Sequence, residues 1–129
     1  MTAQPTVHVE PIPGCPALKM TWQQHVRDED VKTAFEDIIA ALEAREAPLF
    51  VIVDLLSNPR FPLRTTVQEA SSAYRDRRLA AWLIVGSNWM ARMVEGSLSR
   101  LTGRHNVYWY ESEAEALAAL EEMDHTPVT

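Results

Sequence analysis

Hydrophobic and polar residues follow two different periods along this chain, and the periods divide it into strands and helices. Val7 and Val9 alternate with polar neighbours in residues 6–10, and the same alternation recurs in residues 18–22. Alternation is typical of strands that have one face in a core and the other in water. The stretch between them, residues 11–16, is rich in proline and marks a turn. We therefore predict an opening hairpin.

Two later apolar runs, residues 49–53 and 79–85, are continuous rather than alternating. Continuous runs of this length are typical of strands that are covered on both faces, as in the middle of a parallel sheet. A shorter run, residues 107–110, is expected to form the last strand. We expect the two continuous strands to be central and parallel.

Between these strands the apolar residues recur every three or four positions, which is the spacing of amphipathic helices. The spacing predicts helices over residues 28–46, from near Thr66, over residues 88–102 and from Ser112 onward. Thr66 with Glu69, and Ser112 with Glu115, stand at the spacing of capping boxes. The residues expected to face inward in the last three helices are Val67, Ala70, Ser71 and Tyr74; Met90, Met93, Val94, Leu98 and Leu101; and Leu117, Leu120 and Met123.

The resulting order, β-β-α-β-α-β-α-β-α, predicts an α/β fold. We expect a single mixed, mostly parallel sheet of about five strands with four helices, to which the hairpin adds an antiparallel edge. No internal repeat or low-complexity tract interrupts the pattern, so residues 1–129 are interpreted as one domain.

The composition excludes several classes of protein. The chain has one cysteine, Cys15, so no disulfide can form within it. Residues 1–4 lack the features of a signal peptide, and no apolar run approaches the roughly 20 residues that cross a bilayer. We expect a cytoplasmic protein without a membrane span. The net charge of −6 argues against nucleic acid as a partner.

The charge is distributed unevenly. Residues 60–104 hold eight arginines against three acidic residues, whereas the rest of the chain holds four basic and fifteen acidic residues. Two interpretations stay open at this point. The arginine-rich segment forms a surface for an acidic protein or an anionic ligand, or the basic and acidic helices neutralise each other in the fold.

The chain resembles the STAS domain, whose best-known members are bacterial anti-sigma-factor antagonists. The resemblance rests on the two opening strands, an acid-led helix, a strand that ends in Asp54-Leu55-Leu56-Ser57, a helix that starts at Thr65-Thr66, and the closing residues 107–117. The same superfamily includes the CRAL-TRIO lipid-transfer domains. Members that act as phosphorylation switches carry Asp-Ser followed by Gly where this chain has Arg64-Thr65-Thr66. Thr65 and Thr66 are therefore the candidate phosphosites or helix caps.

Other candidate residues follow the predicted strands and line the third helix. Asp54 ends a buried strand, where open α/β sheets place ligands, although an aspartate there also forms turns. Ser87 and Asn88 precede the third helix as an anion site or a plain N-cap. Trp89 follows them as a partner anchor or a hydrophobic staple. We assign Arg92 and Arg100 to a binding surface near Trp89.

Catalytic and metal-binding patterns are missing from the sequence. The four histidines, His8, His25, His105 and His125, fall in separate elements, and none stands close to Cys15. We expect no enzymatic activity, metal or cofactor. The leading hypothesis is a non-enzymatic interaction module in bacterial signalling or regulation, with a protein partner or a second copy of the chain. The alternative is a carrier of a small molecule or lipid, which requires an apolar pocket of roughly 300 Å³ or more.

Overall fold

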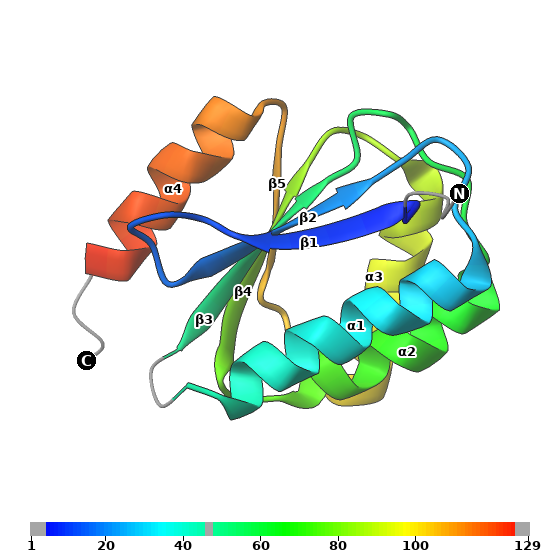
Figure 1. Cartoon of the computed structure of the whole chain (residues 1–129), viewed down its shortest axis with the longest axis horizontal. Coiled ribbons are helices and arrows are strands. Elements are labelled where there is room, and N and C mark those ends of the chain that lie inside the picture. Colours follow the sequence, from blue (N-terminus) through cyan, green and yellow to red (C-terminus); the bar gives the residue numbers. More distant parts are fainter. Residues whose placement is uncertain (1–4, 46–47, 126–129) are drawn as a thin grey trace.

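The computed structural model describes residues 5–45 and 48–125 and shows one five-stranded sheet with four helices (Figure 1). The strands lie in the order β1-β2-β3-β4-β5. They comprise β1 (Val7–Pro11), β2 (Ala17–Trp22), β3 (Leu49–Asp54), β4 (Leu79–Val85) and β5 (Val107–Tyr110). Only β1 and β2 pair antiparallel, and every other neighbouring pair is parallel. The predicted fold class and element order are confirmed.

The two continuous apolar strands occupy the middle of the sheet. β3 pairs with β2 on one side and with β4 on the other, both in parallel. Every residue from Leu49 to Val53 is buried, and β4 has one half-buried residue, Ala80. These strands are apolar throughout because helices cover both of their faces. The prediction that they are central and parallel is confirmed.

Three helices cover one face of the sheet and one helix covers the other (Figure 1). The first group comprises α1 (Asp28–Glu43), α2 (Leu63–Arg75) and α3 (Trp89–Thr102). Beneath these helices lies the larger core, in which the rings of Trp82 and Tyr74 stack with centroids 5.0 Å apart. The last helix, α4 (Glu113–His125), buries Ala116 and Leu120 on the opposite face.

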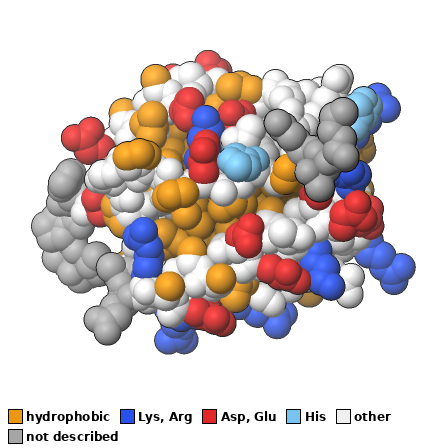
Figure 2. All heavy atoms as spheres, viewed as in Figure 1, with side chains coloured by type: hydrophobic (Ala, Val, Ile, Leu, Met, Phe, Trp, Pro, Cys, Tyr) orange, Lys and Arg blue, Asp and Glu red, His pale blue; other side chains and the backbone are white. Residues whose placement is uncertain are grey.

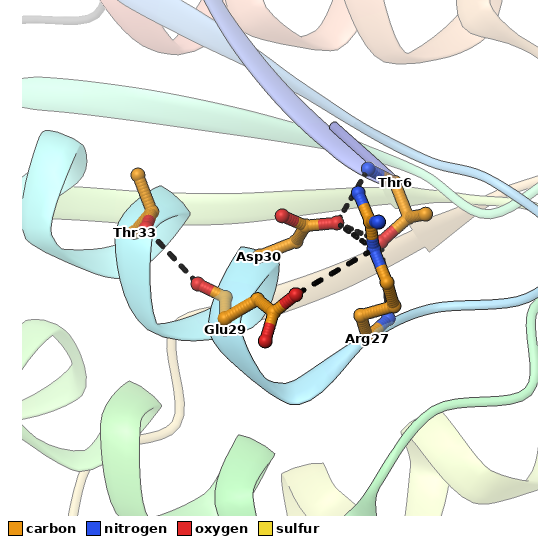
Figure 3. Close-up of polar contacts among 5 residues, drawn as sticks. All are labelled: Thr6, Arg27, Glu29, Asp30 and Thr33. Atoms are coloured by element: carbon orange, nitrogen blue, oxygen red, sulfur yellow. Dashed lines mark hydrogen bonds and ion pairs between the residues drawn. The ribbon is translucent and has the colours of Figure 1, made fainter. Parts of the chain in front are cut away.

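A polar cluster joins the first strand to the first helix (Figure 3). The backbone N–H and the hydroxyl of Thr6 both donate to Oδ2 of Asp30, at 2.8 and 2.6 Å. Arg27 Nε donates to the same oxygen at 3.0 Å. These bonds hold the pKa of the Asp30 carboxyl below its usual value, because they favour the ionised form. The edge strand β1 is thereby tied to the start of α1.

Two predicted helix ends were wrong. α1 ends at Glu43, earlier than the predicted residue 46, which lies outside the described residues. α2 begins at Leu63 rather than near Thr66, and Pro62 occupies the cap position with φ −70° and accepts the first helical bond from Thr66. The fixed φ of proline suits the start of a helix. Thr66 therefore lies inside the first turn, and the capping box with Glu69 is not formed.

The other two helices begin as the sequence predicts. The Asn88 side chain caps α3, and Gly103 ends this helix with φ 72°. At α4, the backbone N–H of Glu115 donates to Ser112 Oγ at 3.2 Å, as in the predicted capping box. The Glu115 carboxylate, however, accepts from the N–H of Glu111 rather than from that of Ser112. The longest helix in the described part of the chain has 16 residues, so none of these helices meets the length and apolar character of a membrane span.

Candidate functional site

The outward side of α3 carries large apolar side chains, contrary to the prediction for two of them. Met93 and Leu101 were expected to face the core, but they are 53% and 59% exposed. Trp89 is 68% exposed. The core contacts of α3 come instead from a narrower stripe centred on Val94 and Leu98. Trp89, Arg92, Met93, Gly96 and Arg100 are spaced three or four residues apart and share one side of the helix, which we call the α3 surface; Leu101 is exposed in the last turn beside it.

The cap residue of α3 fixes the position of this surface. Asn88 is buried, and its Oδ1 accepts from the N–H of Ala91 at 3.0 Å. Its Nδ2 donates to Asn58 Oδ1 and to the carbonyl of Pro59, each at 3.0 Å. The cap thus links α3 to the loop that follows β3. Of the two predicted interpretations of Asn88, the structure shows the N-cap, and Ser87 beside it is exposed.

Arg92 and Arg100 keep their charge available on the α3 surface. The guanidinium carbon of Arg92 lies 4.2 Å from the centroid of the Trp109 ring, a cation–π contact with β5. Nε1 of the same tryptophan donates to Glu95 Oε2 at 3.0 Å, which turns the one acid of α3 toward the sheet. Arg100 Nε donates to the carbonyl of Gly96 at 3.3 Å. Neither arginine forms an ion pair with any described residue.

Two other arginines of residues 60–104, Arg78 and Arg104, form bonds within the fold. Arg78 pairs with Asp76 at 2.7 Å, and this hydrogen bond holds the pKa of Asp76 below its usual value. Arg104 donates to the backbone carbonyls of Tyr74, Asp76 and Leu79, where α2 leads into β4. Within the described ranges, no arginine of residues 60–104 forms a salt bridge with an acid of α1 or α4. Salt bridges to those helices therefore do not neutralise the segment, although the charge of Glu43 in α1 contributes, after the hydrogen bond to Asp76, to the raised pKa of Arg78.

The face of the molecule that includes α1 and α4 has a different character. In Figure 2, acidic and basic side chains are interspersed there around a hydrophobic centre. That view does not show charge of a single sign. Exposed arginines without a salt bridge among the described residues are instead found along α2 and α3, as at Arg75 and Arg92.

Asp54 belongs to a separate cluster on the α4 side of the sheet. Its Oδ1 accepts from the backbone N–H of Leu56 at 2.9 Å, as a turn-forming aspartate does. Its Oδ2 lies 4.0 Å from Lys19 Nζ, which is 2.8 Å from Glu113 Oε1. The hydrogen bond to Glu113 raises the pKa of Lys19. Lys19 is not among the residues predicted for a site, because its position in the strand indicated only a polar face.

The two threonines of the STAS-like position have different surroundings. Thr65 Oγ1 donates to Asp28 Oδ2 at 2.8 Å and so connects the first turns of α2 and α1. Thr66 is 4% exposed, and its hydroxyl has no hydrogen-bond partner among the described residues. Whether either residue is phosphorylated stays a prediction. A phosphate on Thr65 would lie beside the Asp28 carboxylate, where like charges repel.

A small apolar cavity lies between the sheet and helices α2 and α3. Its volume is about 60 Å³, and its lining includes Thr66, Trp22 and Trp82. The indole N–H groups of both tryptophans are buried without a hydrogen-bond partner among the described residues. The cavity is far below the roughly 300 Å³ of typical ligand pockets. Three larger hollows, of about 300, 440 and 430 Å³, lie at the surface and are lined mainly by exposed or half-buried side chains.

Comparison with known proteins supports the fold alone. No family model matches the chain, and no curated protein matches it. Among solved structures, it is similar to an uncharacterised DUF3478-family protein with a SpoIIAA-like fold from Shewanella loihica PV-4. The two share 13% identity with a TM-score of 0.64 over 93% of this chain and 98% of the other. The chain therefore has a STAS-like, SpoIIAA-like fold, as the resemblance in its sequence indicated.

Proposed function

We propose that this chain is a non-enzymatic protein-interaction module that binds an acidic protein through the α3 surface. One observation carries the proposal. Three large apolar side chains of α3, those of Trp89, Met93 and Leu101, are more than half exposed. The exposed charged residues of the same helix are two arginines, and neither forms an ion pair with a described residue. Tryptophan, methionine and arginine are enriched in protein interfaces, and tryptophan and arginine dominate their binding energy.

Gly96 supports the same surface by a different argument. A glycine in the interior of a helix costs roughly 1 kcal/mol relative to alanine. A Cβ built at Gly96 would meet no heavy atom within 4 Å, so packing within the described fold does not require glycine there. The missing side chain leaves room for a partner to approach the helix backbone between Met93 and Arg100. A docked partner would therefore give a reason for glycine at this position that packing within the described fold does not supply.

The carrier hypothesis receives less support from the cavity. A volume of about 60 Å³ is well short of the roughly 300 Å³ or more of typical ligand pockets. The STAS-like fold is compatible with either role, because fold alone does not assign function. A place in bacterial signalling, inside the cytoplasm, completes the proposal through the resemblance to anti-sigma-factor antagonists.

Site-specific photo-crosslinking tests the proposal. A photoreactive amino acid replaces Met93, and the crosslinked partner is identified by mass spectrometry from the cells that produce the protein. We expect one main partner whose crosslinked peptide is rich in Asp and Glu. The Arg92→Glu/Arg100→Glu variant should lose this crosslink, because like charges then meet.

A matched variant controls for net charge. Arg64→Glu/Arg75→Glu changes the charge by the same amount on exposed residues of α2 and should retain the crosslink. If the Arg92/Arg100 variant retains the crosslink, or both variants lose it equally, the α3 surface does not select the partner. Crosslinked peptides without acidic residues would contradict the charge argument.

A further inference from the structure

The acidic surface that best matches the α3 surface belongs to this chain itself. α4 contains no lysine or arginine between Glu113 and Asp124. Its Glu115, Glu121 and Asp124 are exposed, and Leu117 among them is 37% exposed. The helix therefore offers an apolar centre with acidic neighbours. The α3 surface has the same arrangement with basic neighbours, Arg92 and Arg100.

These two helices cannot meet within one molecule. α3 packs on the face of the sheet that buries Val94 and Leu98, and α4 packs on the opposite face through Ala116 and Leu120. Figure 1 shows the sheet between them. The complementary charges are thus held apart by a buried sheet, and only a second copy of the chain can bring them together.

We propose that α4 of a second copy docks on the α3 surface. The inference rests on the α3 surface being a docking site, as proposed above, and it identifies a competitor for that site. At about 1.5 Å rise per residue, Arg92 and Arg100 stand about 12 Å apart along α3. On α4, Leu117, Glu121 and Asp124 are spaced three or four residues apart and therefore share one side of the helix. These three residues extend over about 10 Å of α4, which is close to the separation of the two arginines along α3.

The apolar residues also match in shape. Exposed Ala114 and Ala118 leave a low strip on α4 beside Leu117, and the bulky side chains of Trp89 and Met93 project from α3. Large side chains over small ones allow two helices to approach closely. One of the two arginines then lies near Glu121 and Asp124, where a bidentate pair with a carboxylate is favoured.

The interface joins two different surfaces, so it is heterologous. In a pair of copies, one keeps its α4 free and the other keeps its α3 surface free. Further copies can therefore add to the pair, unless the copies close a ring. A single helix pair buries a small area, which is typical of weak and transient contacts. Exposed charges also make the contact sensitive to salt. Self-association and binding of the acidic partner exclude each other.

Sedimentation velocity over a concentration series tests the inference. We expect the mean mass of the full chain to rise between about 10 µM and about 1 mM at low salt and to fall when salt is added. Arg92→Glu/Arg100→Glu should weaken self-association at least tenfold, and so should Glu121→Lys/Asp124→Lys. All four residues are exposed, so unchanged circular dichroism and thermal unfolding would show that both variants fold.

The mixture of the two variants is the decisive measurement. One variant has acidic residues at both surfaces and the other has basic residues at both, so each repels itself. Mixed in equal amounts, they pair acidic with basic helices, and we expect the mass to rise again. The Arg64→Glu/Arg75→Glu variant serves as the charge control and should associate like the original chain.

The outcomes separate this inference from the proposed function. A chain that stays monomeric throughout the series, or a mixture that remains monomeric, overturns self-association through α3 and α4. Neither result affects the crosslink from residue 93 to an acidic partner, which is measured independently. Association that persists in both variants places the interface elsewhere and also overturns the inference.

Discussion

Substituting two adjacent threonines by valine should change stability in opposite directions. Thr66→Val replaces a buried hydroxyl that has no hydrogen-bond partner among the described residues. Thr65→Val removes the bond from Thr65 Oγ1 to Asp28 Oδ2, which is 2.8 Å long. The two substitutions are chemically identical, are of nearly equal volume, and lie in the same helical turn. Helix propensity therefore cancels between them, and only the surroundings of the hydroxyl differ.

The magnitudes follow from these surroundings. A buried polar group without a partner costs about 1–3 kcal/mol, so Thr66→Val should raise the free energy of unfolding by about 1 kcal/mol. A hydrogen bond to a charged acceptor contributes about 1.5–3 kcal/mol when buried and less in a half-exposed position. Thr65→Val should therefore lower the free energy of unfolding by about 1 kcal/mol. The difference in Tm between the two variants should be about 6 °C.

Urea unfolding, followed by tryptophan fluorescence, measures the free energy of unfolding of each variant. The midpoints can be compared directly if the variants have equal m values. A double variant should come close to the original stability, because the effects are opposite and the side chains make separate contacts. If Thr66→Val destabilises the protein as much as Thr65→Val does, the Thr66 hydroxyl has a partner in solution. The assignment of an unpaired group next to the cavity would then be wrong.

Three further predictions concern other parts of the molecule. Asp30→Asn should lower stability by about 1–3 kcal/mol at neutral pH, because the ionised carboxylate accepts three hydrogen bonds. The pKa of Asp30 is lower in the folded protein than in the unfolded chain. The stability that its carboxylate contributes is therefore complete above about pH 4 and is lost as the pH falls through the folded pKa. Urea midpoints of the original chain and of the Asp30→Asn variant, measured against pH, should converge in acid. Arg104→Ala should cost about 2–3 kcal/mol, and Arg104→Lys should recover only part of the loss in urea unfolding, because one ammonium cannot reproduce the planar fork. Gly96→Ala should raise Tm while weakening the crosslink from residue 93; a stronger crosslink would refute the role of close approach.

The fold could be predicted almost completely, because its signals are local. Continuous apolar runs identified β3 and β4 as inner strands, and glycine and asparagine at the ends of α3 identified its caps. The start of α2 was misjudged because Thr66 and Glu69 have capping-box spacing, whereas Pro62 began the helix one turn earlier. A sequence motif of two residues does not reveal which of two possible caps the chain will use.

The site was harder to predict for a different reason. In α3, apolar residues occupy more of the helix circumference than the core requires, so periodicity alone could not distinguish Val94, which is buried, from Met93, which is exposed. The same ambiguity led to Leu117 being placed in the core, although Ala116 and Leu120 bury the inner side of α4. Both α3 and α4 have more large apolar residues than one buried stripe can hold. This number indicates that each helix has a second apolar side.

The distribution of charge depends on topology, and this determines where the molecule can bind. Each crossover from β2 to β5 advances one strand in the same direction. Since such connections are right-handed, α1, α2 and α3 must all lie on one face of the sheet. α4 follows the last strand and has no crossover to complete, so it covers the face that the other helices leave open. The basic α3 and the acidic α4 are therefore separated by the rule that governs the fold. Their charges do not neutralise each other within the chain, and each helix retains a surface suited to a partner of opposite charge.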